Sequence, residues 1–128
     1  MAKILVVDDH AVQQRMYSYT LRKHGHTVLV AAHGEAALAV LEKTLVDLVI
    51  TDFSMPEMDG LMLLKHMRTE TRYQSLPVIV LINAGNEQDC QLADEAGANA
   101  LLSKPTSSRE LIETAHKLLG GRIIGGMV

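Results

Sequence analysis

Short apolar runs alternate with longer amphipathic segments along the whole chain. Five runs carry almost no polar side chains: Ile4–Val7, Val28–Ala31, Leu48–Thr51, Val78–Ile82 and, more weakly, Ala100–Leu102. Apolar runs that are continuous rather than alternating are typical of strands buried on both faces, as in a parallel sheet. The pattern therefore predicts five buried strands.

A segment with helical signals follows each run. The predicted helices are Val12–His24, Gly34–Lys43, Gly60–Thr69, Glu87–Ala96 and Ser107–Leu119. Gly25, Gly97 and Gly120–Gly121 mark three of the helix ends, and Ser107 with Glu110 forms a capping box. Strict alternation of strand and helix with short connections predicts a doubly wound α/β domain, a parallel sheet with helices on both faces.

Length and composition fit a single domain. The 128 residues are 48% hydrophobic and 21% charged, and we expect the domain over 1–120, with 121–128 as a tail or the start of a linker. A net charge of −3 gives no reason to expect nucleic-acid or anionic-membrane binding. The lone Cys90 excludes an intrachain disulfide, and the first apolar run is too short for a leader or a membrane helix. We therefore expect a cytoplasmic protein.

Charged side chains follow three of the predicted strands. Asp8 and Asp9 come after the first strand, Asp52 after the third and Lys104 after the fifth. Ligands bind at the carboxyl ends of the strands in an open parallel sheet, so these groups should meet at one edge. Each could alone be a helix cap, a turn residue or a surface charge. Together, however, the carboxylates repel one another, which favours a Mg²⁺ ion and, with the lysine, phosphoryl transfer. The six histidines show no metal-binding spacing on one helix face, and we interpret them as surface or helix-end residues.

Four segments that contain these residues resemble a known family. VVDDH, DLVITDFSMPEMDG, LPVIVL and AGANALLSKP are similar to the receiver domain of two-component response regulators, the CheY-like family, over about Lys3 to Leu119. The resemblance implies a flavodoxin-like fold of five strands in the order 2-1-3-4-5 with five helices. It also implies a signalling role rather than an enzymatic one, beyond self-catalysed phosphorylation and dephosphorylation.

The resemblance assigns a role to each charged residue. Asp52 would be the phosphoacceptor, Asp9 a direct Mg²⁺ ligand and Asp8 a ligand through water, while the backbone carbonyl of Ser54 would complete the set. Lys104 would contact the phosphoryl oxygens.

Three further positions and the donor follow from the same resemblance. The Lys104–Pro105 bond is a candidate cis peptide, and Pro56 and Gly60 would shape the loop after Asp52. The donor would be a phosphohistidine on a histidine kinase or a phosphotransfer protein, and the acyl phosphate would then hydrolyse.

The chain departs from the family at two positions of its usual switch. Ile82 stands 22 residues before Lys104, where the family usually has threonine or serine, and Leu101 stands where it has tyrosine or phenylalanine. A lost hydrogen bond to a charged group costs about 1.5–3 kcal/mol. Asn83 carries an amide donor, but strand alternation should point it away from the side of Ile82. The sequence thus predicts intact acceptor chemistry with an altered readout.

Three hypotheses remain open from sequence. The leading one is a phosphorylatable receiver with an atypical switch. The alternative is a binding module that docks partners, or forms a homodimer, through its fourth and fifth helices whatever the state of Asp52. The third, an aspartyl phosphohydrolase, is disfavoured because Ser54 stands where such enzymes place a second acid.

Overall fold

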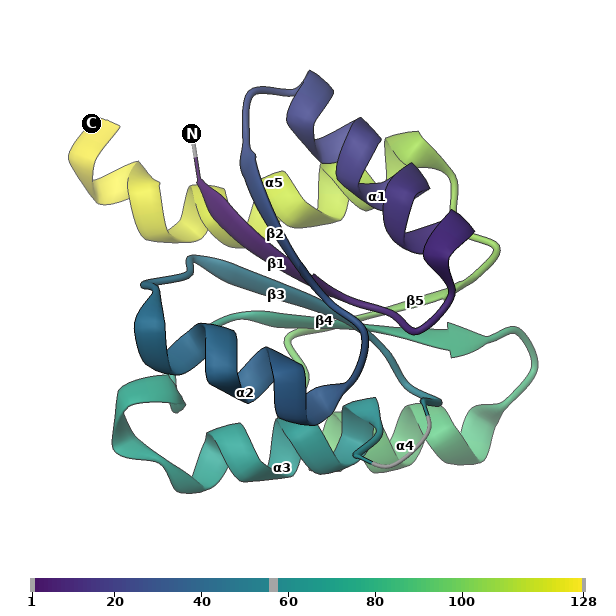
Figure 1. The fold of residues 1–128 in the computed structure, drawn as a ribbon. Helices are drawn as coiled ribbons and strands as arrows, with labels where there is room; N and C mark the ends of the chain where they lie inside the picture. Colours follow the sequence, from purple (N-terminus) through teal and green to yellow (C-terminus); the bar gives the residue numbers. More distant parts are fainter. Residues whose placement is uncertain (1, 56–57, 128) are drawn as a thin grey trace.

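The strands and helices follow one another in the predicted order. The computed structural model describes residues 2–55 and 58–127. The elements are β1 (Lys3–Val7), α1 (Ala11–Lys23), β2 (Thr27–Ala31), α2 (Gly34–Lys43), β3 (Leu48–Asp52), α3 (Gly60–Thr69), a 3-10 turn η1 (Thr71–Tyr73), β4 (Val78–Asn83), α4 (Glu87–Glu95), β5 (Ala100–Lys104) and α5 (Ser108–Met127) (Figure 1).

The five strands form one sheet in which every neighbouring pair is parallel. Their order is β2-β1-β3-β4-β5, which confirms the doubly wound topology and the predicted strand order. Helices α1 and α5 cover one face of the sheet, and α2, α3 and α4 cover the other (Figure 1). The carboxyl ends of all five strands therefore lie along one edge, where ligands of such sheets bind.

The sheet separates two apolar cores. Leu21 of α1 and Leu111 of α5 pack on Ile50 and Leu81 on one face. On the other face, a second cluster joins the strand residues Val49, Val80 and Ile82 to Leu41 of α2, Leu63 and Leu64 of α3 and Ala93 of α4. Alternate residues of one strand contribute to opposite cores, as the two-residue period of a strand requires.

The last helix, α5, extends beyond the glycine pair at which the sequence predicts its end. The sequence placed its end at Gly120–Gly121, and this prediction is wrong, because α5 continues to Met127. Glycine ends a helix when its backbone takes a positive φ, as Gly25 and Gly97 do after α1 and α4. Gly120 does not take a positive φ, so it lowers the helix propensity without ending α5.

The start of α5 agrees with the predicted capping box in one of its two hydrogen bonds. Ser107 Oγ accepts a hydrogen bond from the Glu110 backbone N–H at 3.0 Å. The Glu110 carboxylate accepts instead from the Thr106 hydroxyl at 3.2 Å.

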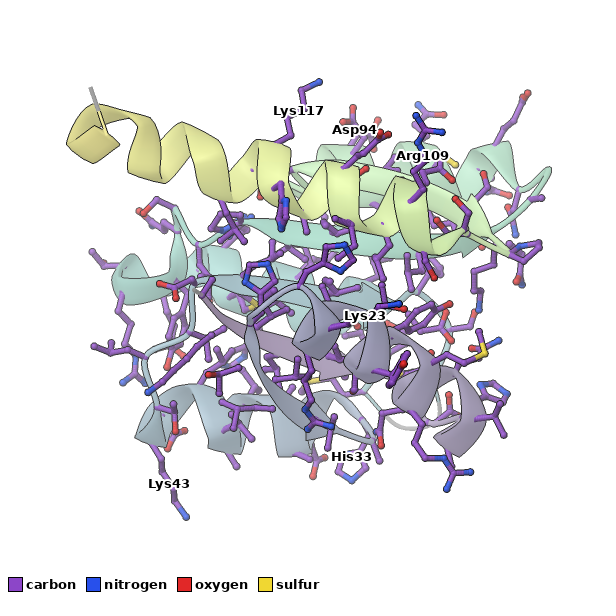
Figure 2. All side chains as sticks on the ribbon, turned by 90° about the horizontal axis from the view of Figure 1, so that it is seen from above. Lys23, His33, Lys43, Asp94, Arg109 and Lys117 are labelled. Carbon is purple, nitrogen blue, oxygen red and sulfur yellow. The ribbon has the colours of Figure 1, made fainter. Side chains whose placement is uncertain are left out.

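Charged side chains at several helix surfaces point outward. Figure 2 shows Lys43 of α2 and Arg109 and Lys117 of α5 directed away from the body of the molecule. In residues 2–55 and 58–127, we find no helix with both the length and the apolar content needed to cross a membrane.

Candidate functional site

Two buried carboxylates lie at the carboxyl ends of neighbouring strands. Asp8 follows β1 and Asp52 ends β3, and each is only 1% exposed. β1 and β3 are paired side by side in the sheet, which brings the two acids together as the sequence predicts. Buried carboxylates need partners or counter-ions, because desolvation disfavours their charge.

Lys104 supplies one such partner. It ends β5, and its ammonium Nζ lies 2.8 Å from Asp52 Oδ1 with the lysine side chain 14% exposed. The Ser54 backbone N–H donates to the same oxygen at 3.4 Å. Asp52 Oδ2 is buried and has no hydrogen-bond partner among the described residues. One oxygen of Asp52 is therefore held by Lys104 and Ser54, whereas the other has no partner in the described part of the chain.

Asp8 is held in place through its main chain and one carboxylate oxygen. Its backbone N–H donates to the Ala31 carbonyl at 3.0 Å, and its own carbonyl accepts from Gln14 Nε2 at 3.0 Å. Oδ1 accepts from the His10 backbone N–H at 2.8 Å, whereas the buried Oδ2 has no partner in the described part of the chain. Burial raises the pKa of Asp8, and the nearby Asp52 raises it further against the opposing hydrogen bond from His10.

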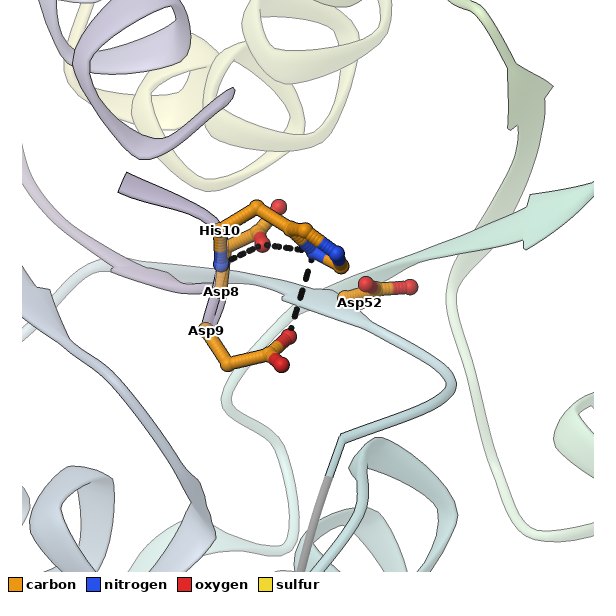
Figure 3. Close-up of side chains that lie close together, drawn as sticks. All are labelled: Asp8, Asp9, His10 and Asp52. Carbon is orange, nitrogen blue, oxygen red and sulfur yellow. Dashed lines mark hydrogen bonds and ion pairs between the residues drawn. The ribbon is translucent and has the colours of Figure 1, made fainter. Parts of the chain in front are cut away.

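His10 belongs to this group, which the sequence alone did not indicate. Its Nδ1 lies 3.4 Å from Asp8 Oδ1 and 3.3 Å from Asp9 Oδ1 (Figure 3). One potential ligand atom from each of Asp8, Asp9, His10 and Asp52 lies within 4.8 Å of the other three. The only signal in the sequence was that His10 directly follows the acid pair.

The donor set fits a divalent cation. Asp8, Asp9 and Asp52 contribute three carboxylates, and Lys104 contributes one neutralising ammonium, which leaves two negative charges in a partly buried space. Two buried carboxylate oxygens still lack a partner among the residues described. Hard divalent ions such as Mg²⁺ take oxygen ligands of this kind. The role of the Ser54 carbonyl stays a prediction, and Pro56 lies outside the described residues.

Gly60, the first residue of α3, packs tightly against the main chain of Asp52 and Phe53. The Gly60 backbone N–H donates to the Phe53 carbonyl at 3.0 Å, and a Cβ at Gly60 would collide with the backbone carbonyl of Asp52. Asp59 Oδ1 caps α3 by accepting from the Met62 N–H at 2.9 Å. On the opposite side of the site, the Lys104–Pro105 peptide bond is cis, as predicted.

Known proteins with the same fold share much of this sequence. The family model described as "Response regulator receiver domain" matches residues 4–116. The chain belongs to the response regulator receiver family. Receiver domains are signalling modules of two-component systems rather than classical enzymes; they generally bind Mg²⁺ at an acidic pocket, and histidine kinases or phosphotransfer proteins phosphorylate them.

Individual receivers resemble this chain over nearly its whole length. A chemotaxis protein CheY homolog of Campylobacter jejuni is 39% identical over 120 residues, which are 92% of each chain. A putative response regulator from Chloroflexus aurantiacus has a TM-score of 0.90 at 34% identity, with 93% of this chain and 98% of that chain covered. The chemotaxis response regulator CheY4 of Vibrio cholerae has a TM-score of 0.87 at 34% identity, with coverages of 92% and 98%.

The two positions that the sequence predicts for the switch carry apolar, packed side chains. Ile82 is 1% exposed within the core beneath α3 and α4, and Leu101 is half-buried against the same core. Asn83 is exposed at the end of β4, where it pairs in register with Lys104. Strand alternation therefore places Asn83 on the face of Lys104, opposite to that of Ile82.

Proposed function

We propose that this receiver accepts a phosphoryl group on Asp52. The observation that carries the proposal is the state of the Asp52 carboxylate, whose Oδ1 is held 2.8 Å from Lys104 Nζ while the buried Oδ2 lacks a partner among the described residues. Most buried carboxylate oxygens with a purely structural role are hydrogen-bonded. An acceptor instead needs one oxygen free to bond to phosphorus beside a fixed positive charge.

The reaction breaks the phosphorus–nitrogen bond of a phosphohistidine as a bond forms between an Asp52 oxygen and phosphorus. The Lys104 ammonium offsets negative charge on the phosphoryl oxygens, and it is already in place before the reaction. Asp8, Asp9, Asp52 and the Ser54 carbonyl would hold Mg²⁺, which when bound neutralises further charge on these oxygens. Hydrolysis of the resulting acyl phosphate releases inorganic phosphate and restores Asp52.

The surface of α1 supports docking of the donor protein. Val12, Met16 and Tyr19 lie on one face of α1 and are 63%, 54% and 68% exposed. A groove of about 310 Å³ continues from Met16 and Tyr19 to Ser108 at the start of α5. Val12 lies three residues after Asp9, so a donor protein bound to this face would reach the end of α1 that is nearest to the acidic group. The homodimer through α4 and α5 stays a prediction.

The output of this receiver runs through an altered switch. The residues at positions 82 and 101 offer neither a hydroxyl nor an aromatic ring, and both pack in the core on the face opposite to Lys104. A bound group shifts a conformational equilibrium only through its different affinities for the two states. With these two contacts missing, phosphorylation discriminates less between two loop conformations.

Mass spectrometry after incubation with a small-molecule phosphodonor and Mg²⁺ tests the proposal. We expect the wild type to gain one phosphoryl group, Asp52→Asn to gain none, and Lys104→Ala to gain much less because it lacks the neutralising ammonium. Lys43→Ala is the matched control, since it removes a lysine that points away from the molecule (Figure 2). Labelling that persists in Asp52→Asn would overturn the choice of acceptor.

A further inference from the structure

The imidazole of His10 distinguishes the cation site of this chain from a purely carboxylate one. His10 is the N-cap residue of α1, with extended backbone angles (φ −91°, ψ 111°), and its side chain makes no capping hydrogen bond. Its side chain is 62% exposed, and its ion-pair contacts are with Asp8 and Asp9. The ring is therefore close to the carboxylates without being used to hold the helix.

The geometry brings a nitrogen donor into the same small space as three oxygens. His10 Nδ1 lies 3.3 Å from Asp9 Oδ1, and a ligand atom of His10 is within 4.8 Å of one from each of Asp8, Asp9 and Asp52. Atoms that share one metal ion are separated by distances of this size or less, because metal–ligand bonds are about 2.0–2.3 Å long. The buried Oδ2 atoms of Asp8 and Asp52, which have no partner among the described residues, are an independent indication that this group binds a ligand.

A mixed nitrogen and oxygen donor set selects a different class of ion from an all-oxygen set. Mg²⁺ prefers oxygen ligands and retains its waters, whereas imidazole suits first-row transition ions, whose affinities for such sites rise along the Irving–Williams series. We propose that His10 is a fourth metal ligand and that this receiver binds transition-metal ions such as Co²⁺ or Zn²⁺ more tightly than Mg²⁺. The inference rests on the cation site of the proposed function, but not on phosphorylation.

A role for His10 as a simple cation, and not as a ligand, predicts a different effect of its removal on metal affinity. If the ring acts only as a cation paired with Asp8 and Asp9, its removal frees carboxylates for any metal. The affinities for Mg²⁺ and for Co²⁺ would then change in the same direction. A ligand role changes the two affinities unequally, and this difference can be measured without any phosphoryl donor.

Titration of the full chain with MgCl₂ and with CoCl₂ separates the two roles. We expect His10→Ala to weaken Co²⁺ binding at least about tenfold, and to change Mg²⁺ binding by no more than about twofold, since Mg²⁺ does not need the nitrogen. His10→Gln keeps a polar side chain without the imidazole and should behave like His10→Ala. In the Co²⁺-loaded wild type, a paramagnetically shifted imidazole signal should appear in the proton NMR spectrum and be absent from both variants.

The controls separate failure of this inference from failure of the proposed function. His116→Ala alters a histidine pair elsewhere in the molecule, where His26 Nε2 and His116 Nε2 are 2.9 Å apart, and it should leave the His10-dependent signal unchanged. Asp9→Ala should weaken both metals, and unchanged Mg²⁺ binding in that variant would count against the cation site and hence the proposed function. Equal changes for both metals in His10→Ala, or no change for Co²⁺, would overturn the ligand role alone.

Discussion

At the scale of single residues, the buried carboxylate of Asp8 lowers the stability of the fold. Its carboxylate is 1% exposed, one oxygen has no partner among the described residues, and burial together with Asp52 raises its pKa. A raised pKa in a carboxyl group means that its charged form destabilises the folded state, and this cost is present above the folded pKa and is relieved as the pH falls. The metal-free protein at neutral pH therefore carries this cost.

We predict that Asp8→Asn stabilises the metal-free protein by about 1–2 kcal/mol, because it removes a buried charge and keeps an acceptor for the His10 N–H. Mg²⁺ at about ten times its dissociation constant should stabilise the wild type by about 1.4 kcal/mol and the variant by less. Urea denaturation with EDTA and with millimolar Mg²⁺ measures both effects. A variant less stable than the wild type in EDTA would contradict this account of Asp8.

Gly60 is a second residue whose identity is determined by the site. A Cβ there would collide with the Asp52 backbone carbonyl, which cannot move away as a flexible side chain could. We predict that Gly60→Ala destabilises the fold by about 1–3 kcal/mol and reduces phosphodonor labelling, because it displaces Asp52. Gly120→Ala is the matched control: outside its own turn of helix, no atom of the described residues lies within 4 Å of the added Cβ, and a helical alanine should stabilise the fold by up to about 1 kcal/mol. Chemical denaturation and mass spectrometry decide the comparison.

At the scale of elements, apolar side chains pack at the end of β4 and the start of β5, where the proposed switch positions lie. Ile82 is fully buried and Leu101 half-buried against the core beneath α3 and α4. We predict that beryllofluoride, a phosphoryl mimic, changes the backbone NMR shifts of α4 and α5 little in the wild type. Ile82→Thr with Leu101→Tyr should enlarge these changes, because it restores a hydroxyl and a mobile ring.

The two single variants control for this experiment, since each restores only one of the two groups. In Ile82→Thr, a buried hydroxyl without a hydrogen-bond partner lowers the free energy of unfolding by about 1–3 kcal/mol. The double variant carries the same substitution, so its spectra are compared with those of the wild type only under conditions in which it is folded. Large shift changes across both helices in the wild type would refute the altered switch and direct attention to Asn83 as a substitute donor.

At the scale of the whole molecule, a pair of histidines joins the start of the sheet to the last helix. His26 Nε2 and His116 Nε2 are 2.9 Å apart, and His26 Nδ1 accepts a hydrogen bond from the Ala2 N–H at 3.2 Å. The neutral His26 ring therefore carries its proton on Nε2 and donates to His116. Protonation would place a second proton on Nδ1, where it would oppose the Ala2 N–H.

This arrangement predicts a loss of stability in mild acid. Burial lowers the pKa of His26 below its usual 6.5, and His116 and His24 lower it further. Because the folded pKa is the lower one, the full stability is present above 6.5 and falls as the pH drops through 6.5 towards the folded value. One proton contributes at most about 1.4 kcal/mol per pH unit. In thermal melts between about pH 5 and 8, the melting temperature of His26→Asn should depend less steeply on pH than that of the wild type. An unchanged slope in His26→Asn would contradict the role of this pair.

The features that the sequence predicted correctly follow from local patterns. The apolar runs mark the strands because a strand that is buried on both faces needs apolar side chains at consecutive positions. The parallel arrangement of these strands then brings Asp8, Asp52 and Lys104 to one edge of the sheet. The features that it missed depend on contacts that no local pattern encodes. His10 enters the site through the backbone angles at the start of α1, and His26 meets His116 across 90 residues of sequence.

The two-sided sheet has an evolutionary consequence. Because side chains alternate along each strand, Lys104 and Asp52 point to the same face of the sheet as Leu81 and Leu102. Ile82 and Leu101 pack in the core on the other face. Substitutions on one face therefore need not disturb the side-chain contacts of the other. A lineage can therefore retain Asp52 and Lys104 under selection while the residues at positions 82 and 101, on the other face of the sheet, change freely or are selected for a different output.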